Sequence, residues 1–397
     1  MDENSNYHIS LTILKQCRIC GNKHFNKILS YKSTQIDGFY FKSPVIKKNK
    51  TPITLLRCAK CGLFQLHEII NNRIYKDYNF SSQVSLKITS WQHKAAEIIK
   101  KIMKNKNANI LEIGSGDGSF LCNFMSYQII GIEPSKKLSL QAKETGVPII
   151  NSYFSSSISK KFTQKIDFVI VRHVFEHINV LKTMVVNIVK TLKDDGYVYI
   201  ESPYVCDILR KHNYSNIFFE HVNYFCITDM VNLFKSFGLF LYKHGFNDIH
   251  NGSFYCIFGK KKNNCKIPRS DSITKAEIMK FKEDFKQYKI SLKNIITKYK
   301  KAIICGYGGA NKTSQLLSLS GLTRNNIDEI YDKNQNIQNL YIAYSDIPIV
   351  APIKIMTTKP DYLIIFASAY EKEIIKEMMT LGYKGKFIRT YPTIKIL

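Results

Sequence analysis

A glycine-rich turn between two short apolar segments constrains the fold of this chain most strongly. In "ANILEIGSGDGSFL" an apolar strand at residues 108–113 runs into a turn containing Gly114, Gly116 and Gly118, and a helix is expected to follow. Glycines let the backbone turn sharply and approach a ligand closely. The segment "IIGIEPS" places Glu133 at the end of a second strand, where a carboxylate can accept hydrogen bonds from ribose hydroxyls. The two features together predict a Rossmann-like nucleotide fold.

Further apolar segments complete an α/β domain. Strands are predicted at residues 166–171 and 197–201, with a helix at 181–192 between them, which indicates a doubly wound parallel sheet. Two carboxylates, Glu112 on the first strand and Asp117 inside the turn, would repel a pyrophosphate. S-adenosylmethionine has no phosphate and carries cationic sulfonium and amino groups. The carboxylates therefore favour this methyl donor over a dinucleotide.

A second glycine-rich turn lies near the C-terminus. "AIICGYGGANKTSQLL" again predicts strand, turn and helix, and "IDEIYDKN" places Asp332 where the next strand would end. We expect the N-terminus of this helix and Lys312 to face a phosphate of the substrate. Residues 275–301 contain neither Gly nor Pro and are expected to form a solvated connecting helix between domains. The predicted domains are 1–74, 75–271 and 272–397.

Four of the ten cysteines form two CxxC pairs, "CRICG" and "CAKCG". Each pair lets two thiolates reach one ion, and two pairs complete a closed tetrahedral shell suited to a structural zinc. The N-terminus is polar and acidic, whereas a signal peptide is basic and then apolar, so we expect a cytoplasmic protein in which thiols persist. Incidental free cysteines are the alternative. The predicted metal ligands are Cys17, Cys20, Cys58 and Cys61.

The charge balance is strongly basic, with 58 Lys and Arg against 31 Asp and Glu and a net charge of +27. The excess is mostly lysine spread along the chain, without the clustered basic and aromatic surface of a nucleic-acid site. We therefore expect no nucleic-acid partner. We also expect no membrane partner, because no apolar run reaches the roughly 20 residues of a membrane helix. A nucleic-acid-binding module remains an alternative, in which zinc knuckles and lysines bind phosphate in a salt-dependent manner.

The segment "FFEHVNYF" sets a carboxylate and an imidazole, Glu220 and His221, among aromatic residues. Burial accounts for the aromatic residues but not for the two ionisable ones, so proton transfer is indicated. An imidazole titrates near neutral pH and suits a general base. Adjacent residues of a strand point to opposite faces, so a tight turn is expected if both side chains act together. A buried histidine with one structural hydrogen bond is the alternative.

The order of motifs along the chain resembles one family. "ILEIGSGDGSFL" with "GIEPS" resembles the donor-binding motifs of class I S-adenosylmethionine-dependent methyltransferases. With the CxxC module, "YNFSSQVS", "IESPY", "HNGSF" and "GYGGANK", the chain resembles the three-domain sugar C-methyltransferases. These have an N-terminal zinc-binding domain, a Rossmann-like catalytic core and a C-terminal α/β domain. The resemblance implies methylation of a nucleotide-diphosphate-linked deoxy-keto-sugar at a ring carbon beside the ketone. We expect a monomer or weak oligomer.

The resemblance also implies roles for single residues. His221 matches the last histidine of the family's Tyr-His-Glu-His run and is the expected base, although Phe218 and Phe219 replace the first two residues of that run. Tyr78 matches a family tyrosine that closes over the site. Independently of the resemblance, His177 follows the strand that should end beside the methyl donor, so it is expected to stabilise the enolate oxygen. The predicted catalytic residues are His221, Glu220, His177 and Tyr78. The predicted donor contacts are Glu112, Gly114, Ser115, Gly116, Asp117, Glu133, Pro134, Arg172 and His173. The predicted substrate contacts are Tyr204, Tyr224, Asn251, Gly252, Ser253, Tyr307, Gly308 and Lys312.

Two alternatives concern the same residues. An O- or N-methyltransferase would use the same donor, with His221 deprotonating a hydroxyl or orienting the acceptor. Loss of a carbon-bound hydrogen from the acceptor distinguishes it from a C-methyltransferase. The helical spacing of His173 and His177 also suggests a metal, but the sequence shows no third ligand.

Overall fold

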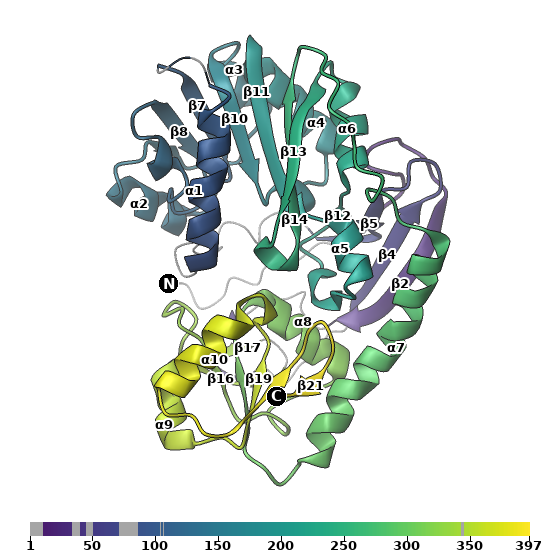
Figure 1. Cartoon of the computed structure of the whole chain (residues 1–397), viewed down its shortest axis with the longest axis vertical. Coiled ribbons are helices and arrows are strands. Elements are labelled where there is room, and N and C mark those ends of the chain that lie inside the picture. The colour runs from purple at the N-terminus through teal and green to yellow at the C-terminus, as the bar shows by residue number, and fades with distance from the viewer. Residues whose placement is uncertain are drawn as a thin grey trace.

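The computed structural model describes residues 11–33, 40–44, 51–70, 86–103, 105, 107–342 and 345–397. Figure 1 shows a large central sheet at the top, a small N-terminal sheet beside it and a second α/β unit below. The long helix α7 (Lys275–Lys298) runs along one side and leads into the lower unit.

The central sheet has the strand order β13-β14-β11-β10-β7-β8-β9. Its strands are β7 (Asn109–Ile113), β8 (Gln128–Ile132), β9 (Ile149–Ile150), β10 (Ile166–Arg172), β11 (Leu192–Pro203), β13 (Phe240–Asn247) and β14 (Ser253–Gly259). The strands from β11 to β9 are parallel, as predicted. At one edge the sheet continues with two strands that were not predicted, where β14 runs antiparallel to β11 and β13. Residues 248–252 join β13 to β14 without a crossover helix, which permits only antiparallel pairing.

Strand β10 illustrates how the core is built. Phe168 and Ile170 share a buried cluster with helix α1 (Leu86–Lys100), whereas Val169 and Val171 share another with helix α4. Such a continuous apolar strand is typical of a parallel sheet covered by helices on both faces. The helices and 3-10 turns of this part are α1, α2 (Lys136–Glu144), α3 (Ser156–Lys161), α4 (Leu181–Thr191), α5 (Val205–Arg210), α6 (Ile227–Lys235), η3 (Leu121–Phe124), η4 (Phe175–His177), η5 (Tyr214–Asn216) and η6 (Ile249–Asn251).

The α-helix predicted after the first glycine-rich turn is wrong, because only the 3-10 turn η3 forms there. Asn123 Nδ2 donates to Phe120 O at 2.9 Å, and Tyr127 N donates to Phe124 O at 2.8 Å. These bonds turn the chain into β8 before a second helical turn can form.

The N-terminal sheet combines strands from distant parts of the sequence. Strands β2 (Phe25–Ser33), β4 (Thr51–Cys58) and β5 (Phe64–Leu66) pair antiparallel, and β12 (Asn223–Tyr224) adds to β5. Because β12 lies in "FFEHVNYF", the domain boundary that we propose near residue 74 separates two parts that share a sheet. The remaining pairs are β1 (Leu11–Ile13) with β6 (Glu68–Ile70) and β3 (Tyr40–Phe41) with β17 (Tyr341–Ile342).

The C-terminal unit is a second α/β sheet in the order β18-β16-β15-β19-β20-β21. Its elements are β15 (Ile304–Tyr307), α8 (Asn311–Ser320), β16 (Ile330–Tyr331), β18 (Ile349–Val350), η7 (Pro352–Lys354), α9 (Ile355–Thr358), β19 (Tyr362–Ile365), η8 (Ser368–Tyr370), α10 (Glu371–Thr380), β20 (Lys386–Arg389) and β21 (Lys395–Ile396). The predicted strand, turn and helix around the second glycine-rich turn are confirmed, and Asp332 directly follows β16.

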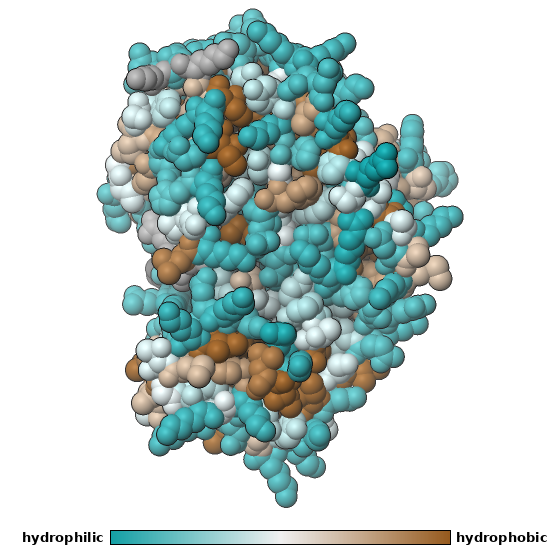
Figure 2. All heavy atoms as spheres, in the orientation of Figure 1, coloured by the Kyte–Doolittle hydropathy of each residue, from teal (hydrophilic) through white to brown (hydrophobic). Residues whose placement is uncertain are grey.

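Helix α7 is not the fully solvated connector that its charge predicts. Phe281, Phe285, Leu292 and Ile296 are buried and form one apolar face that packs into both cores. On the face of the molecule in Figure 2, hydrophilic side chains cover most of the surface, and the largest brown area lies over the C-terminal unit. No helix within the described ranges is long and apolar enough to cross a membrane.

Candidate active site and metal centre

The first glycine-rich turn lies at the carboxyl end of β7. Gly114 has a φ of 72°, and a Cβ there would lie 2.4 Å from Val174 Cγ2, so the position requires glycine. Glu133 holds the turn from the next strand, because Oε2 accepts from Gly116 N at 2.9 Å and Oε1 accepts from Ser135 N at 2.8 Å. Each carboxylate oxygen retains a lone pair that could receive a ribose hydroxyl.

Three more predicted donor contacts surround this turn. Asp117 Oδ1 accepts from Ser119 N at 3.1 Å. Ser115 Oγ is buried and has no hydrogen-bond partner in the part of the chain that the structure describes. Pro134 directly precedes Ser135, whose side chain caps α2. The Ser115 hydroxyl is therefore available for a ligand.

Glu112 lies deeper, on β7. Burial raises its pKa to about 8, although Arg172 Nη1, 3.8 Å from Oε1, opposes the shift. Its Oε2 is buried and lacks a hydrogen-bond partner among the described residues. A buried, unpartnered carboxylate oxygen fits a cationic or hydrogen-bond-donating ligand group, such as the amino group of S-adenosylmethionine.

Arg172 and His173, both predicted donor contacts, face Glu201 on β11. Arg172 Nε donates to Glu201 Oε2 at 3.1 Å, and its guanidinium lies 4.0 Å from the ring centroid of Phe120. His173 Nε2 lies 3.5 Å from Glu201 Oε1, and Trp91 Nε1 donates to the same oxygen at 2.7 Å. The two cationic residues are thus held by one buried carboxylate.

Glu201 was not among the site residues predicted from the sequence. Burial alone would raise its pKa, but contacts with His173 and Arg172 outweigh burial and hold the pKa at about 2. Burial likewise lowers the pKa of His173, but contacts with Glu176 and Glu201 outweigh it and raise that pKa to about 9. The available signal was the carboxylate of "IESPY" at the end of an apolar strand.

The predicted tight turn in "FFEHVNYF" is confirmed, because His221 N donates to Phe218 O at 3.0 Å. The His221 ring centroid lies 4.3 Å from that of Phe218 and 4.9 Å from that of His177. Its Nδ1 is buried, with no hydrogen-bond partner among the residues described. Burial and nearby positive charge lower the pKa of His221 well below its ordinary value, so the imidazole is neutral. Tyr78 lies outside the described residues.

His177 is oriented by the main chain of Glu220, whose side chain is also buried. His177 Nδ1 lies 2.9 Å from Glu220 O, and because a carbonyl only accepts, Nδ1 carries the proton. Burial lowers the pKa of His177. The neutral ring then presents a lone pair at Nε2, which can accept a hydrogen bond but cannot donate one.

Glu176 faces the imidazoles of His177 and His221. It was not among the site residues predicted from the sequence. Its ligand oxygen and one nitrogen each of His177 and His221 lie within 4.8 Å of one another. Ser202 Oγ donates to Glu176 Oε2 at 3.1 Å. The cluster therefore offers three possible metal ligands, Glu176, His177 and His221. It does not include His173, which the helical spacing had paired with His177. It is close enough to hold a cation or to surround a small acceptor.

Several predicted substrate contacts use their hydroxyls within the fold. Tyr204 OH donates to Asp271 Oδ1 at 3.0 Å, and Tyr224 OH accepts from Phe218 N at 3.2 Å. Ser253 Oγ donates to a backbone carbonyl of η6 at 2.8 Å. These three residues stabilise the edge of the central sheet and residues 218–225, which we call the catalytic segment. The direction in which each hydroxyl points could not be predicted from the sequence.

The "HNGSF" segment faces the C-terminal unit. Asn251 Nδ2 donates to Ser368 Oγ at 3.1 Å. Gly252 has a φ of 133°, and a Cβ there would lie 2.4 Å from Asp207 Oδ2. Asn251 therefore links this segment to the C-terminal unit, and Gly252 leaves no room for a side chain against α5.

Three predicted substrate contacts belong to the second glycine-rich turn. Tyr307 OH donates to Glu377 Oε2 at 3.1 Å and so points into its own unit. Gly308 adopts a φ of 95°. Burial lowers the pKa of Lys312, at the start of α8, to about 8, although the carboxylates of Glu176 and Glu220 oppose the shift.

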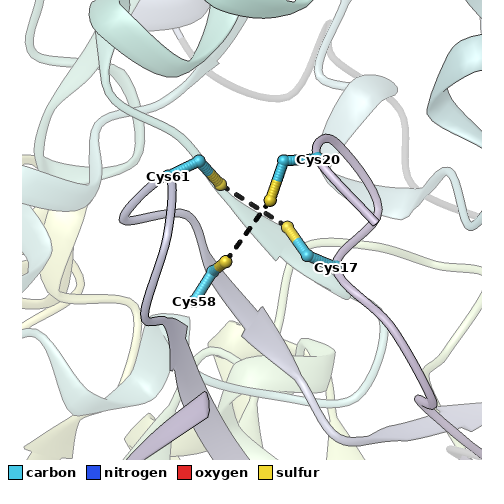
Figure 3. Close-up of side chains that lie close together, drawn as sticks. All are labelled: Cys17, Cys20, Cys58 and Cys61. Atoms are coloured by element: carbon cyan, nitrogen blue, oxygen red, sulfur yellow. Dashed lines mark hydrogen bonds between the residues drawn. The ribbon is translucent and has the colours of Figure 1, made fainter. Parts of the chain in front are cut away.

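The four predicted metal ligands converge from two knuckles (Figure 3). Cys17 Sγ lies 3.5 Å from Cys61 Sγ, and Cys20 Sγ lies 3.5 Å from Cys58 Sγ. In each knuckle a glycine N–H donates to the carbonyl of the first cysteine, at 2.9 and 3.1 Å. Tetrahedral zinc with bonds of about 2.3 Å separates sulfurs by about 3.8 Å, so the four thiols fit this ion in chemistry and spacing.

A Rossmann-like sheet with a glycine-rich turn, a carboxylate beyond its second strand and a second buried carboxylate beside that turn defines a class I S-adenosylmethionine-dependent methyltransferase. Comparison with known families agrees. Residues 88–244 match a methyltransferase domain, and residues 268–392 match the C-methyltransferase C-terminal domain.

Individual proteins are more distant. The C-methyltransferase NovU of Streptomyces niveus is 24% identical over 409 residues, which cover 97% of each chain. Similar solved structures include the PH0226 protein from Pyrococcus horikoshii OT3, with 16% identity, TM-score 0.39 and coverage of 46% of this chain and 95% of that one. A SAM-dependent methyltransferase from Archaeoglobus fulgidus has 16% identity, TM-score 0.37 and coverage of 43% and 93%. The two domain matches and the full-length relative support the assignment of this chain as an S-adenosylmethionine-dependent C-methyltransferase.

Proposed function

We propose that this C-methyltransferase methylates a ring carbon beside the ketone of a nucleotide-diphosphate-linked deoxy-keto-sugar, through an enolate formed by a base. The observation that carries the proposal is the imidazole of His221, which is buried, neutral and unpartnered at Nδ1 among the described residues. A carbon beside a ketone becomes nucleophilic only after it loses a proton, and a neutral imidazole is the form that can take that proton.

The donor side of the site complements this chemistry. When bound, S-adenosylmethionine supplies a methyl group on a cationic sulfur. Glu133 and the turn at Gly116 would hold its ribose, and the unpartnered oxygen of Glu112 would receive its amino group. These residues bind and orient the donor and carry out no proton transfer themselves.

His221 takes the ring proton in this proposal, and His177 supports it. The two rings meet edge to face with an interplanar angle of 72°. Since the Nδ1 proton of His177 is engaged by Glu220 O, His177 offers only a lone pair towards the acceptor. We therefore assign His177 to positioning His221 and the acceptor, in place of the oxyanion role expected from its position after the strand.

We further propose a structural zinc ion at the four cysteines. The four sulfurs leave no coordination position for substrate, so the ion would stabilise the fold. Arg18, inside the first knuckle, donates from Nη1 to Val222 O at 3.1 Å. The knuckle thereby supports the residue next to His221.

The proposed reaction is tested by incubating the protein with S-adenosylmethionine and a panel of nucleotide-linked 4-keto-6-deoxy sugars in heavy water. A new carbon-bound methyl group, with loss or exchange of the adjacent ring hydrogen, is the expected result in mass and proton spectra. A methyl group on oxygen or nitrogen would contradict the enolate mechanism. Donor binding without transfer to any panel member would contradict the substrate class.

A further inference from the structure

The enolate oxygen in the proposed reaction needs a cation or a hydrogen-bond donor. His177 supplies neither in its neutral form, because its Nδ1 proton is engaged by Glu220 O at 2.9 Å and burial lowers its pKa. His221 is also held neutral by burial. A different group must therefore face the negative charge that develops on the acceptor.

Helix α8 brings a lysine to this place from the C-terminal unit. In Figure 1 α8 lies at the top of that unit, facing the catalytic part. Gln315 Nε2 donates to Tyr31 OH, and Tyr31 OH donates to Ile217 O, a carbonyl in the segment that leads to His221. Lys312 lies one helical turn before Gln315 on the same side of α8. The hydrogen-bond chain thus ties the Lys312 face of the helix to the catalytic segment.

Two more contacts hold the start of α8 in this position. Tyr40 OH donates to Gly309 O at 3.0 Å in the turn before the helix. Asn251 Nδ2 donates to Ser368 Oγ at 3.1 Å in the neighbouring turn of the same unit. The C-terminal unit is therefore hydrogen-bonded to the rest of the molecule in the turn before α8 and at η8.

Lys312 forms no ion pair within 4.0 Å in the described part of the chain. Burial lowers its pKa to about 8, against the attraction of Glu176 and Glu220, so the ammonium is mostly charged at neutral pH. Its charge also contributes to the lowered pKa of His177 and of His221. A cation that acts on both imidazoles, yet is not neutralised by a direct partner, is available for an anionic acceptor.

We propose that Lys312 is a catalytic residue that binds the enolate oxygen, so that the active site is completed by the C-terminal unit. The inference rests on the proposed function. His221 takes the ring proton, and the electron pair of the broken C–H bond moves onto the ketone oxygen beside the Lys312 ammonium. The electron pair then returns to carbon and forms the bond to the methyl group, while the S–CH₃ bond electrons stay on sulfur. The ring proton remains on His221 after the methyl transfer, and Lys312 transfers no proton.

This role differs from a phosphate contact in what it stabilises. A lysine that binds a diphosphate contributes equally before and during the reaction, so its loss weakens substrate binding. A lysine that binds the enolate oxygen meets full negative charge only after proton removal, so its loss slows that step. The kinetic split between binding and turnover therefore separates the two roles.

The test compares Lys312→Met and Lys312→Arg with wild type in the heavy-water assay, with Lys386→Met as a matched control. Lys386 is an exposed lysine at the amino end of β20, the sheet edge opposite the glycine-rich turn. We expect Lys312→Met to lower turnover and ring-hydrogen exchange about 10²- to 10³-fold, as loss of an oxyanion donor does. Affinity for the nucleotide sugar should change less than about threefold. Lys312→Arg should retain part of the wild-type turnover, and Lys386→Met should retain all of it.

Each other outcome overturns a defined statement. Weaker sugar-nucleotide binding with unchanged turnover would make Lys312 a phosphate contact. Equal loss in the Met and Arg variants, with melting temperature also lowered equally, would assign the effect to packing. If Lys312→Met exchanges the ring hydrogen at the wild-type rate, the role of Lys312 is overturned and the proposed function stands. No exchange and no carbon methylation in wild type would overturn the proposed function and the inference with it.

Discussion

Replacement of Glu201 by Gln is expected to destabilise the protein by about 3 kcal/mol at neutral pH. Glu201 is fully buried. Burial would raise its pKa, but His173 and Arg172 hold it at about 2, against 4.5 for an ordinary glutamate. The difference of about 2.5 (4.5 − 2), at about 1.36 kcal/mol per pKa unit, gives about 3 kcal/mol. Gln keeps the size and can still accept from Trp91, but it removes the carboxylate that both cations share and leaves Arg172 with Glu112 and His173 with Glu176.

The sign of the pH dependence follows from the same carboxylate. The folded-state pKa of Glu201 lies below the unfolded value, so its stabilising contribution is complete above about pH 4.5 and is lost as the pH falls towards 2. The difference in unfolding free energy between wild type and Glu201→Gln should therefore be largest between about pH 4.5 and 6.5 and shrink below about pH 4.5. It should also shrink as the pH rises towards 9, where His173 loses the proton that Glu201 stabilises.

Urea unfolding can be followed by the fluorescence of Trp91, the single tryptophan, which donates directly to Glu201. Glu277→Gln is the matched control. A hydrogen bond from Arg210 gives Glu277 a pKa of about 2 as well, but this pair lies at the surface, where solvent reduces its worth to below about 1 kcal/mol. A loss below about 1 kcal/mol in Glu201→Gln, or equal losses in both variants, would refute the reasoning.

Three further predictions concern the base, the metal and the donor turn. His221→Asn should lower turnover about 10²- to 10⁴-fold and leave donor binding, measured by calorimetry, intact. His177→Asn should lower turnover by a smaller factor. Unchanged turnover in His221→Asn would exclude His221 as the base. Metal analysis should find one zinc ion per chain. Chelation should lower both the melting temperature and turnover, because Arg18 connects the knuckle to Val222 O. A metal-free protein with an unchanged melting temperature would exclude the site. Gly114→Ala should weaken donor binding at least about tenfold, since its Cβ would meet Val174 and its φ is 72°. Gly238→Ala has a similar φ of 76° but open space around it, so its donor affinity should be that of wild type.

The sequence by itself determined the features that depend on neighbouring residues. The apolar strands, both glycine-rich turns and the two cysteine knuckles follow from local spacing, because backbone conformation and strand burial are set within a few residues. The tight turn at His221 could be expected for the same reason, from the chemistry of an adjacent carboxylate and imidazole. The carboxylates beside the first turn indicated the methyl donor, and family resemblance added the order of the domains and the expected substrate class.

Only the tertiary structure decided which polar groups meet. Tyr204, Tyr224 and Tyr307 were attractive substrate contacts in the sequence, but packing turns their hydroxyls towards partners within the fold. Glu201 became a central residue because two strands bring Arg172 to it. Such contacts depend on sheet register and on the packing of separate units, where small shifts change which atoms lie within hydrogen-bond distance. No local spacing in the sequence encodes that geometry.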